Sequence, residues 1–240
     1  MNDISEKEYN RLKKRVLYED NHLLIVNKAP SDIVQGDKTG DAPLSELYKG
    51  YLKRKYNKQG NVFLGVTHRL DRPTSGAVIF AKTGKVLPRL NKMLQERGIS
   101  KFYWAVVAKS PKPKSGKLTH FLTRDTKKNK SFASDTEKSN SKKAELNYEV
   151  ISSSDRYFLL NIELLTGRHH QIRAQLSVIG SPIKGDLKYG FKTSNKDGSI
   201  SLHARKLSFI HPVKNERVTI IAPTPDDKLW SFFEKTTKEK

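Results

Sequence analysis

The chain has 240 residues, with 46 Lys and Arg against 25 Asp and Glu, which gives a formal net charge of +21. It contains no cysteine, which excludes disulfides, thiolate metal sites and a cysteine nucleophile. A charge of this size attracts polyanions, of which nucleic acid is the commonest in the cytosol, and no apolar run is long enough to span a membrane. We therefore expect a cytoplasmic, nucleic-acid-binding monomer with no membrane partner, and a merely soluble basic protein is the alternative.

The first half of the chain alternates short apolar runs with polar segments. Residues 1–15 are predicted to be a basic N-terminal extension, either helical or only partly ordered, ahead of one domain over residues 16–240. Apolar periodicity and turn residues then predict, in chain order, two strands within 16–28, a loop over 29–43, a helix over 44–56, strands at 62–66 and 77–81, a helix over 87–94 closed by Gly98, and a strand at 102–108.

The second half begins with a segment of different composition. Residues 109–143 hold 11 Lys and Arg against 3 Asp and Glu, and we predict a hairpin with long mobile loops. The pattern after it predicts strands at 145–152 and 157–165, a helix over 169–178, a loop to residue 201, a strand at 218–221 and a helix over 229–233. Strands outnumber helices and interleave with them irregularly, which is typical of an α+β domain with a mixed or antiparallel sheet.

The segment HRLDRPTSG, residues 68–76, places a carboxylate in a polar turn between two apolar strands. Arg69 and Arg72 flank Asp71, and nearby cations favour the ionised form of a carboxylate. An ionised Asp71 suits a nucleophile or a base and does not suit a general acid. A turn held only by local ion pairs is the alternative interpretation.

Two further segments carry polar or aromatic candidates. TGRHHQIRAQ, residues 166–175, opens a helix with Arg168 and Gln171, which offer donors to phosphates and base edges. In the predicted strand KFYWAV, alternation puts Tyr103 on the face opposite Trp104, and Tyr103 is placed to stack on an RNA base. A solvated basic helix and ordinary core packing are the respective alternatives.

Motifs for metal and nucleotide chemistry do not occur in the sequence. There is no HExxH pair and no GxGxxG after a strand, and the GxxxxG spacing of Gly180 and Gly185 is followed by Asp186 rather than by Lys. We therefore expect no metal, no nucleotide cofactor and no other cofactor.

Taken together and in order, these segments resemble the RluA-type pseudouridine synthases. HRLDRPTSG resembles the family's HRLDxxTSG signature, and TGRHHQIRAQLSVIGSPIKGDLKYG resembles its GRxHQIRxHL motif followed by GxPIxGDxxYG. EDNHLLIVNK and SLHARKLSF resemble its opening and closing motifs. The opening motif departs from the pattern, because Lys28 is followed by Ala, Pro and Ser31 where the family has KPAG. Gln175 also stands where His is common.

The resemblance implies an isomerase that converts uridine in RNA to pseudouridine, with Asp71 as the catalytic carboxylate, Tyr103 against the target base and Arg173 paired with the aspartate. It implies an α+β fold with a bent, largely antiparallel sheet, flanking helices and a central active-site cleft. About 15 residues precede the match, so we expect no S4-type module and capture of RNA by the catalytic domain. The candidate RNA-binding residues are His68, Arg69, Arg72, Arg168, Gln171 and Lys127.

The RNA target and the class of protein leave alternatives open. Ribosomal RNA is the expected substrate, with transfer RNA second. A non-catalytic RNA-binding or ribosome-assembly protein with the same fold is one alternative, although a binder has no need of a carboxylate facing phosphates. A methyltransferase is another, but it requires a cofactor loop that the sequence does not show.

Overall fold

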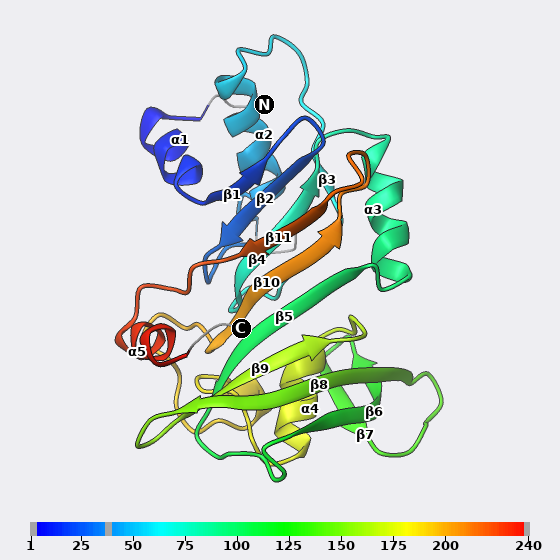
Figure 1. The fold of residues 1–240 in the computed structure, drawn as a ribbon, viewed down its shortest axis with the longest axis vertical. Coiled ribbons are helices and arrows are strands. Elements are labelled where there is room, and N and C mark those ends of the chain that lie inside the picture. Colours follow the sequence, from blue (N-terminus) through cyan, green and yellow to red (C-terminus); the bar gives the residue numbers. More distant parts are fainter. Residues whose placement is uncertain (1–3, 37–39, 238–240) are drawn as a thin grey trace. The chain divides into compact units, whose positions relative to one another are not determined.

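The structure is a computed structural model that describes residues 4–36 and 40–237. Within this part of the chain lie five α-helices and eleven strands (Figure 1). The chain divides into two compact units. One holds the residues up to Ile99 together with Leu207–Pro223, and the other holds Ser100–Lys206 and the residues from Thr224 onward.

The first unit contains an antiparallel set of strands with three helices. Strand β2 (Leu23–Lys28) pairs with β1 (Val16–Glu19) and with β4 (Ser75–Ala81), which also pairs with the two-residue β3 (Gly65–Val66). Every residue of β4 is buried. The helices are α1 (Glu6–Lys13), α2 (Leu44–Lys55) and α3 (Val86–Gln95), and β11 (Arg217–Ile221) pairs with β10 (Leu202–Ile210).

The predicted elements of this unit are largely confirmed. Helix α1 is capped by the Ser5 hydroxyl, which accepts from the Glu8 amide, and it buries Leu12. The helical alternative is therefore correct for Glu6–Lys13, and residues 1–3 of the predicted extension lie outside the described residues. The expected strand at 62–66 is wrong in extent, since only Gly65 and Val66 pair. Residues 37–39 of the predicted loop lie outside the described residues.

The second unit is a sheet of five antiparallel strands in the order β5-β9-β8-β6-β7. The strands are β5 (Ile99–Val107), β6 (Ser115–Asp125), β7 (Lys130–Ser134), β8 (Lys142–Ser153) and β9 (Phe158–Leu164). One face carries α4 (Gln171–Val178), with Ala174 and Tyr189 packed on Leu122 and Ala144. The opposite face carries α5 (Lys228–Thr236), whose Trp230 and Phe233 pack on Trp104 and Val106.

Two predictions for the second half of the chain need correction. The basic segment 109–143 does form a hairpin, in which β6 pairs with the short strand β7, but the turn between them spans only residues 126–129. Strand β10 was not predicted, because its apolar residues are interrupted by His203, Arg205 and Lys206. The α+β class and the largely antiparallel sheet are confirmed. The bend, the central cleft and the domain boundary at residue 15 stay predictions.

Candidate active site

Asp71 lies where the sequence predicts it, in the polar connection between β3 and β4. Its side chain is half-buried, and its carbonyl accepts from the Thr74 amide at 3.0 Å, which closes a turn just before β4 begins. The following strand is wholly buried. A carboxylate at the end of a buried strand is held on a rigid support, as a reacting group requires.

Lys28, the last residue of β2, binds the backbone of this turn through its buried side chain. Its side chain is 1% exposed, and its Nζ donates to the carbonyls of Ala29 at 3.0 Å, Arg72 at 3.0 Å and Thr74 at 2.6 Å. Burial lowers the pKa of Lys28 to about 7, while three carbonyl acceptors match the three N–H donors of the ammonium form. Two of these carbonyls belong to residues on the C-terminal side of Asp71, so Lys28 fixes the turn that presents it.

Ser31 also contacts the turn that carries Asp71, and its own backbone is strained. Its φ is 72°, in the left-handed region, and its amide donates to the Arg72 carbonyl at 2.9 Å. The family's KPAG pattern has glycine at this position, and glycine adopts this conformation without strain. The departure in the opening motif therefore preserves the loop conformation with a less suitable residue.

The other candidates of this segment lie on the same turn with different environments. Arg69 is exposed, and the Nη2 of Arg72 is 2.5 Å from a carboxylate oxygen of Asp41. His68 accepts from the Ile79 amide through Nε2 at 3.1 Å, so this nitrogen anchors the ring to β4. Contact of these three residues with RNA stays a prediction.

In the second unit, Arg173 of α4 is locked by Asp186. Its Nε donates to one carboxylate oxygen at 2.7 Å and its Nη2 to the other at 2.9 Å, and both side chains are buried. A two-point pair fixes the plane of the guanidinium as well as its position. It uses one edge of the group, so the Nη1 edge is not engaged by Asp186.

The Asp186 loop has a conformation that only glycine permits at the preceding position. Gly185 has a φ of +86°, and a β-carbon there would stand 2.8 Å from the Ser199 carbonyl and from the Asn195 side chain. The loop then leads into Tyr189, whose ring lies 5.0 Å from the Arg173 guanidinium carbon. Gly185 thus allows Asp186 to reach Arg173.

His170 connects this cluster to the start of α4. It has a φ of 53°, its Nδ1 is 3.0 Å from the Tyr189 hydroxyl, and its ring stacks on His169. Burial, followed by the charge of Arg173, lowers the pKa of His170 to about 2. His170 is therefore neutral at physiological pH, although the cations Arg173 and Lys188 lie near it.

The predicted RNA-binding residues of this unit fall into two groups. Lys127 is exposed in the turn between β6 and β7, and Arg168 is exposed with its Nε bound to the Lys143 carbonyl at 3.1 Å. Gln171 is 3% exposed, and its carboxamide is bonded to Thr166, the Arg168 amide and the Glu145 carbonyl. Its donors and acceptor serve the fold, which argues against the expected contact between Gln171 and RNA.

Tyr103 occupies the predicted face of β5. It stands opposite Ile162 of β9, on the face that carries α4, whereas Phe102 and Trp104 point to the other face. The alternation predicted from the sequence is confirmed. Tyr103 is 7% exposed, so most of the ring packs in the sheet. Asp71 belongs to the first unit and Tyr103 and Arg173 to the second, and their joint action stays a prediction.

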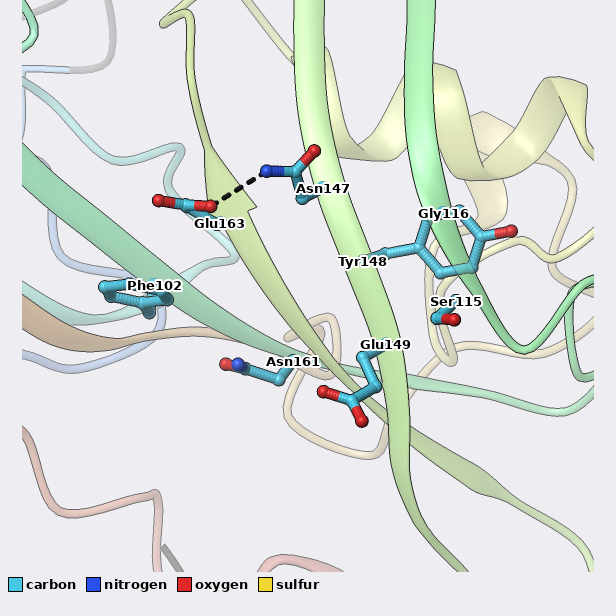
Figure 2. Close-up of a pocket in the computed structure, with 8 residues that line it drawn as sticks. All are labelled: Phe102, Ser115, Gly116, Asn147, Tyr148, Glu149, Asn161 and Glu163. Atoms are coloured by element: carbon cyan, nitrogen blue, oxygen red, sulfur yellow. Dashed lines mark hydrogen bonds between the residues drawn. The ribbon is translucent and has the colours of Figure 1, made fainter. Parts of the chain in front are cut away.

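The face of the sheet that carries Phe102 has a hollow of about 470 Å³, shown in Figure 2. Figure 2 shows the carboxylates of Glu149 and Glu163 and the amides of Asn147 and Asn161 around it. Carboxylates repel RNA phosphates, and Tyr103 lies on the opposite side of β5. The acidic lining of this hollow therefore disfavours a phosphate-bearing ligand there.

Comparisons with known proteins identify the family to which the chain belongs. The profile of the RNA pseudouridylate synthase family matches residues 22–178. An uncharacterized RNA pseudouridine synthase of Mycoplasma genitalium is 35% identical over 91% of this chain and 69% of its own length. The ribosomal large subunit pseudouridine synthase C of Buchnera aphidicola (subsp. Acyrthosiphon pisum) is 34% identical over 90% of this chain and 69% of its own. The structure of human RNA pseudouridylate synthase domain containing 4 superimposes with a TM-score of 0.78 over 96% of both chains at 22% identity, and shows the fold.

These findings define the class of protein as an enzyme that modifies uridine in RNA. The chain belongs to the RluA-type family of RNA pseudouridine synthases, so it is an isomerase that converts uridine in RNA to pseudouridine. No helix among the described residues is long and apolar enough to cross a membrane.

Sequence reasoning missed three supporting residues. Lys28, Asp186 and Tyr189 all lie within motifs quoted for the resemblance, but none was assigned a role. Each has a hydrogen-bond partner far away in sequence, at 46 positions for Lys28, 13 for Asp186 and 58 for Tyr189, which is beyond the reach of spacing arguments. The signal available was that a lysine, an aspartate and a tyrosine occur in otherwise apolar or glycine-rich motifs.

Proposed function

We propose that this chain isomerises a uridine of ribosomal RNA in the cytoplasm, acting as a monomer, and that Asp71 is its catalytic carboxylate. The observation that carries the proposal is the support of Asp71, whose turn is held by the bonds from buried Lys28 to the Arg72 and Thr74 carbonyls. The choice of ribosomal RNA rests on the Buchnera relative, which is named as a ribosomal large subunit enzyme. The formal charge of +21 favours a polyanionic substrate.

The reaction exchanges one glycosidic bond for another. The bond between N1 of uracil and C1′ of ribose breaks, the base rotates, and a bond forms between C5 and C1′. The hydrogen on C5 then leaves and N1 gains a proton, so no atom is lost and no redox change occurs. Asp71 acts at the ribose, either as nucleophile toward C1′ or as base.

The remaining residues position the base and the carboxylate. The uridine must leave the stacked helix to expose C1′ and C5, at a cost of a few kcal/mol, which phosphate contacts offset. Tyr103 would pack against the extruded base and assist removal of the C5 proton. Arg173, oriented by Asp186, would keep Asp71 ionised through the guanidinium edge that Asp186 does not use.

Pseudouridine mapping in a strain that lacks the gene tests this proposal. We expect at least one site in ribosomal RNA to be lost and to return when the parental gene is supplied, but not when the Asp71→Asn gene is supplied. Loss confined to transfer RNA would contradict the ribosomal substrate. Return of the site with Asp71→Asn would contradict the role of Asp71.

A further inference from the structure

Lys101 of β5 places a cation on the face of the sheet that holds Tyr103. The two residues are two positions apart, so their side chains project from the same face about 6.6 Å apart along the strand. The Nζ of Lys101 lies 3.6 Å from the point where a β-carbon on Gly167 would stand. The ammonium is therefore next to the segment that joins β9 to α4.

The environment of Lys101 lacks the partners that Lys82 and Lys28 have. Burial alone lowers the pKa of Lys101, and no carboxylate among the described residues offsets it. By contrast, the Nζ of Lys82 lies 2.9 Å from a carboxylate oxygen of Glu19, and Lys28 donates to three carbonyls. A desolvated charge without an anion destabilises a fold, and an apolar side chain of similar length would be more favourable there.

Position and charge together indicate an anionic ligand that arrives with the substrate. The absence of a side chain at Gly167 leaves space beside the ammonium, since Lys101 is the one neighbour within 4 Å of the missing β-carbon. The sheet hollow with Glu149 and Glu163 lies on the opposite face, so these carboxylates do not serve Lys101. In an enzyme that acts on RNA, the anion at this distance from the base-contacting tyrosine is a phosphate of the target strand.

We propose that Lys101 binds the RNA phosphate adjacent to the uridine that Tyr103 contacts, an assignment that rests on the proposed function. The cost of the partly buried ammonium is then relieved only in the complex with RNA. Lys101 thus contributes affinity at one defined phosphate, unlike the exposed lysines of the surface, which attract RNA without regard to position.

The test uses the full chain and an oligonucleotide carrying the uridine identified by the mapping described above. The oligonucleotide is made with natural phosphates, or with one neutral methylphosphonate on the 5′ or the 3′ side of that uridine. Binding is measured for the parent, Lys101→Met, Lys101→Arg and, as a surface control, Lys138→Met, since Lys138 is exposed.

We expect Lys101→Met to bind the natural oligonucleotide about 10- to 100-fold more weakly, the loss typical of a charge-assisted contact. One methylphosphonate should weaken binding of the parent and of Lys138→Met by a similar factor and leave Lys101→Met unaffected, because both changes remove the same contact. Lys101→Arg should recover most of the affinity. Without RNA, Lys101→Met should melt at the same or a higher temperature than the parent, a result that a structural role would not produce.

Equal sensitivity of the parent and Lys101→Met to both methylphosphonates would overturn the assignment. The assignment would also be overturned if Lys101→Met bound the natural oligonucleotide as tightly as the parent does. If the parent then still converted the uridine, the isomerase function would stand without this role for Lys101. If the parent converts no RNA at all, the proposed function fails, and the assignment of Lys101 fails with it.

Discussion

Arg173 and Asp186 form a buried pair in which two guanidinium nitrogens meet two carboxylate oxygens at 2.7 and 2.9 Å. The pair joins helix α4 to the loop that follows it, 13 residues away in sequence. Two parallel bonds hold the guanidinium in one plane, so the direction of its remaining edge is decided before substrate arrives. Asp186 is in this sense a positioning residue for Arg173.

Replacing Asp186 with Asn should destabilise the protein and slow turnover. The change removes the carboxylate that binds buried Arg173 at two points, and breaking a buried ion pair costs about 3–5 kcal/mol in comparable cases. Thermal unfolding and single-turnover rates of Asp186→Asn and Asp186→Glu would measure both effects, and we expect Glu to recover part of each. The control is Glu234→Gln, which removes a more exposed ion pair with Arg205 and should cost less than about 1 kcal/mol. Parental stability of Asp186→Asn would contradict a role for the pair.

Asp71→Asn should abolish turnover while folding and RNA affinity stay nearly intact. The amide keeps the size of the side chain but is neither a nucleophile nor a base. Residual activity above about 1%, equivalent to a barrier change below about 2.7 kcal/mol, would rule out Asp71 as the essential group. Asp41→Asn is the matched control, because Asp41 pairs with Arg72 of the same segment and is exposed.

Tyr103→Phe should bind RNA as well as the parent but form product slowly. The ring supplies stacking, worth about 1–3 kcal/mol per base, and Phe retains it. Tyr103→Ala should lose both binding and rate, and it should also lower the melting temperature because the ring is 7% exposed. Parental single-turnover rates for Tyr103→Phe would assign the residue to packing alone.

Stability should fall as the pH falls from about 6.5 toward 5, with His170 as one cause. The pKa of His170 is about 2 in the folded protein, against a reference value of 6.5 for the unfolded chain. Between pH 6.5 and pH 5 the unfolded chain therefore binds more protons than the folded protein, so lowering the pH favours unfolding. The contribution from this group over the interval is about 1–2 kcal/mol. Urea unfolding at pH 7 and pH 5 should show a smaller loss for His170→Gln than for the parent. An equal loss would mean that His170 is protonated in the folded state.

Ser31→Gly should stabilise the protein by about 0.5–1 kcal/mol. The left-handed conformation of Ser31 destabilises the folded protein by about 1–2 kcal/mol, and glycine removes this strain. The gain is smaller than the strain, because glycine also raises the conformational entropy of the unfolded chain. Ser100→Gly in extended β5 is the control and should have the opposite sign. The urea midpoints of the two variants measure the effect, and a lower midpoint for Ser31→Gly would contradict the assigned strain.

Much of the local structure could be predicted from the sequence, because its causes are local. Helix α2 repeats apolar residues such as Tyr48 and Tyr51 at helical spacing, and strand β4 is a continuous apolar run. Gly76 and Asp71 stand in a motif whose order with the other motifs identifies the family. These signals depend on neighbours within a few positions, so a linear reading detects them.

The environment of the candidate site was decided by the tertiary structure alone. Sequence spacing did not show that Asp186 is the buried partner of Arg173, that Gln171 turns its carboxamide inward, or that Lys28 holds the Asp71 turn. It also missed β10, because a strand with charged residues such as Arg205 is recognised by its pairing rather than by its composition. Each of these features depends on which distant segment supplies a carbonyl, a carboxylate or a neighbouring strand, and that choice is made only when the chain folds and removes these polar groups from water.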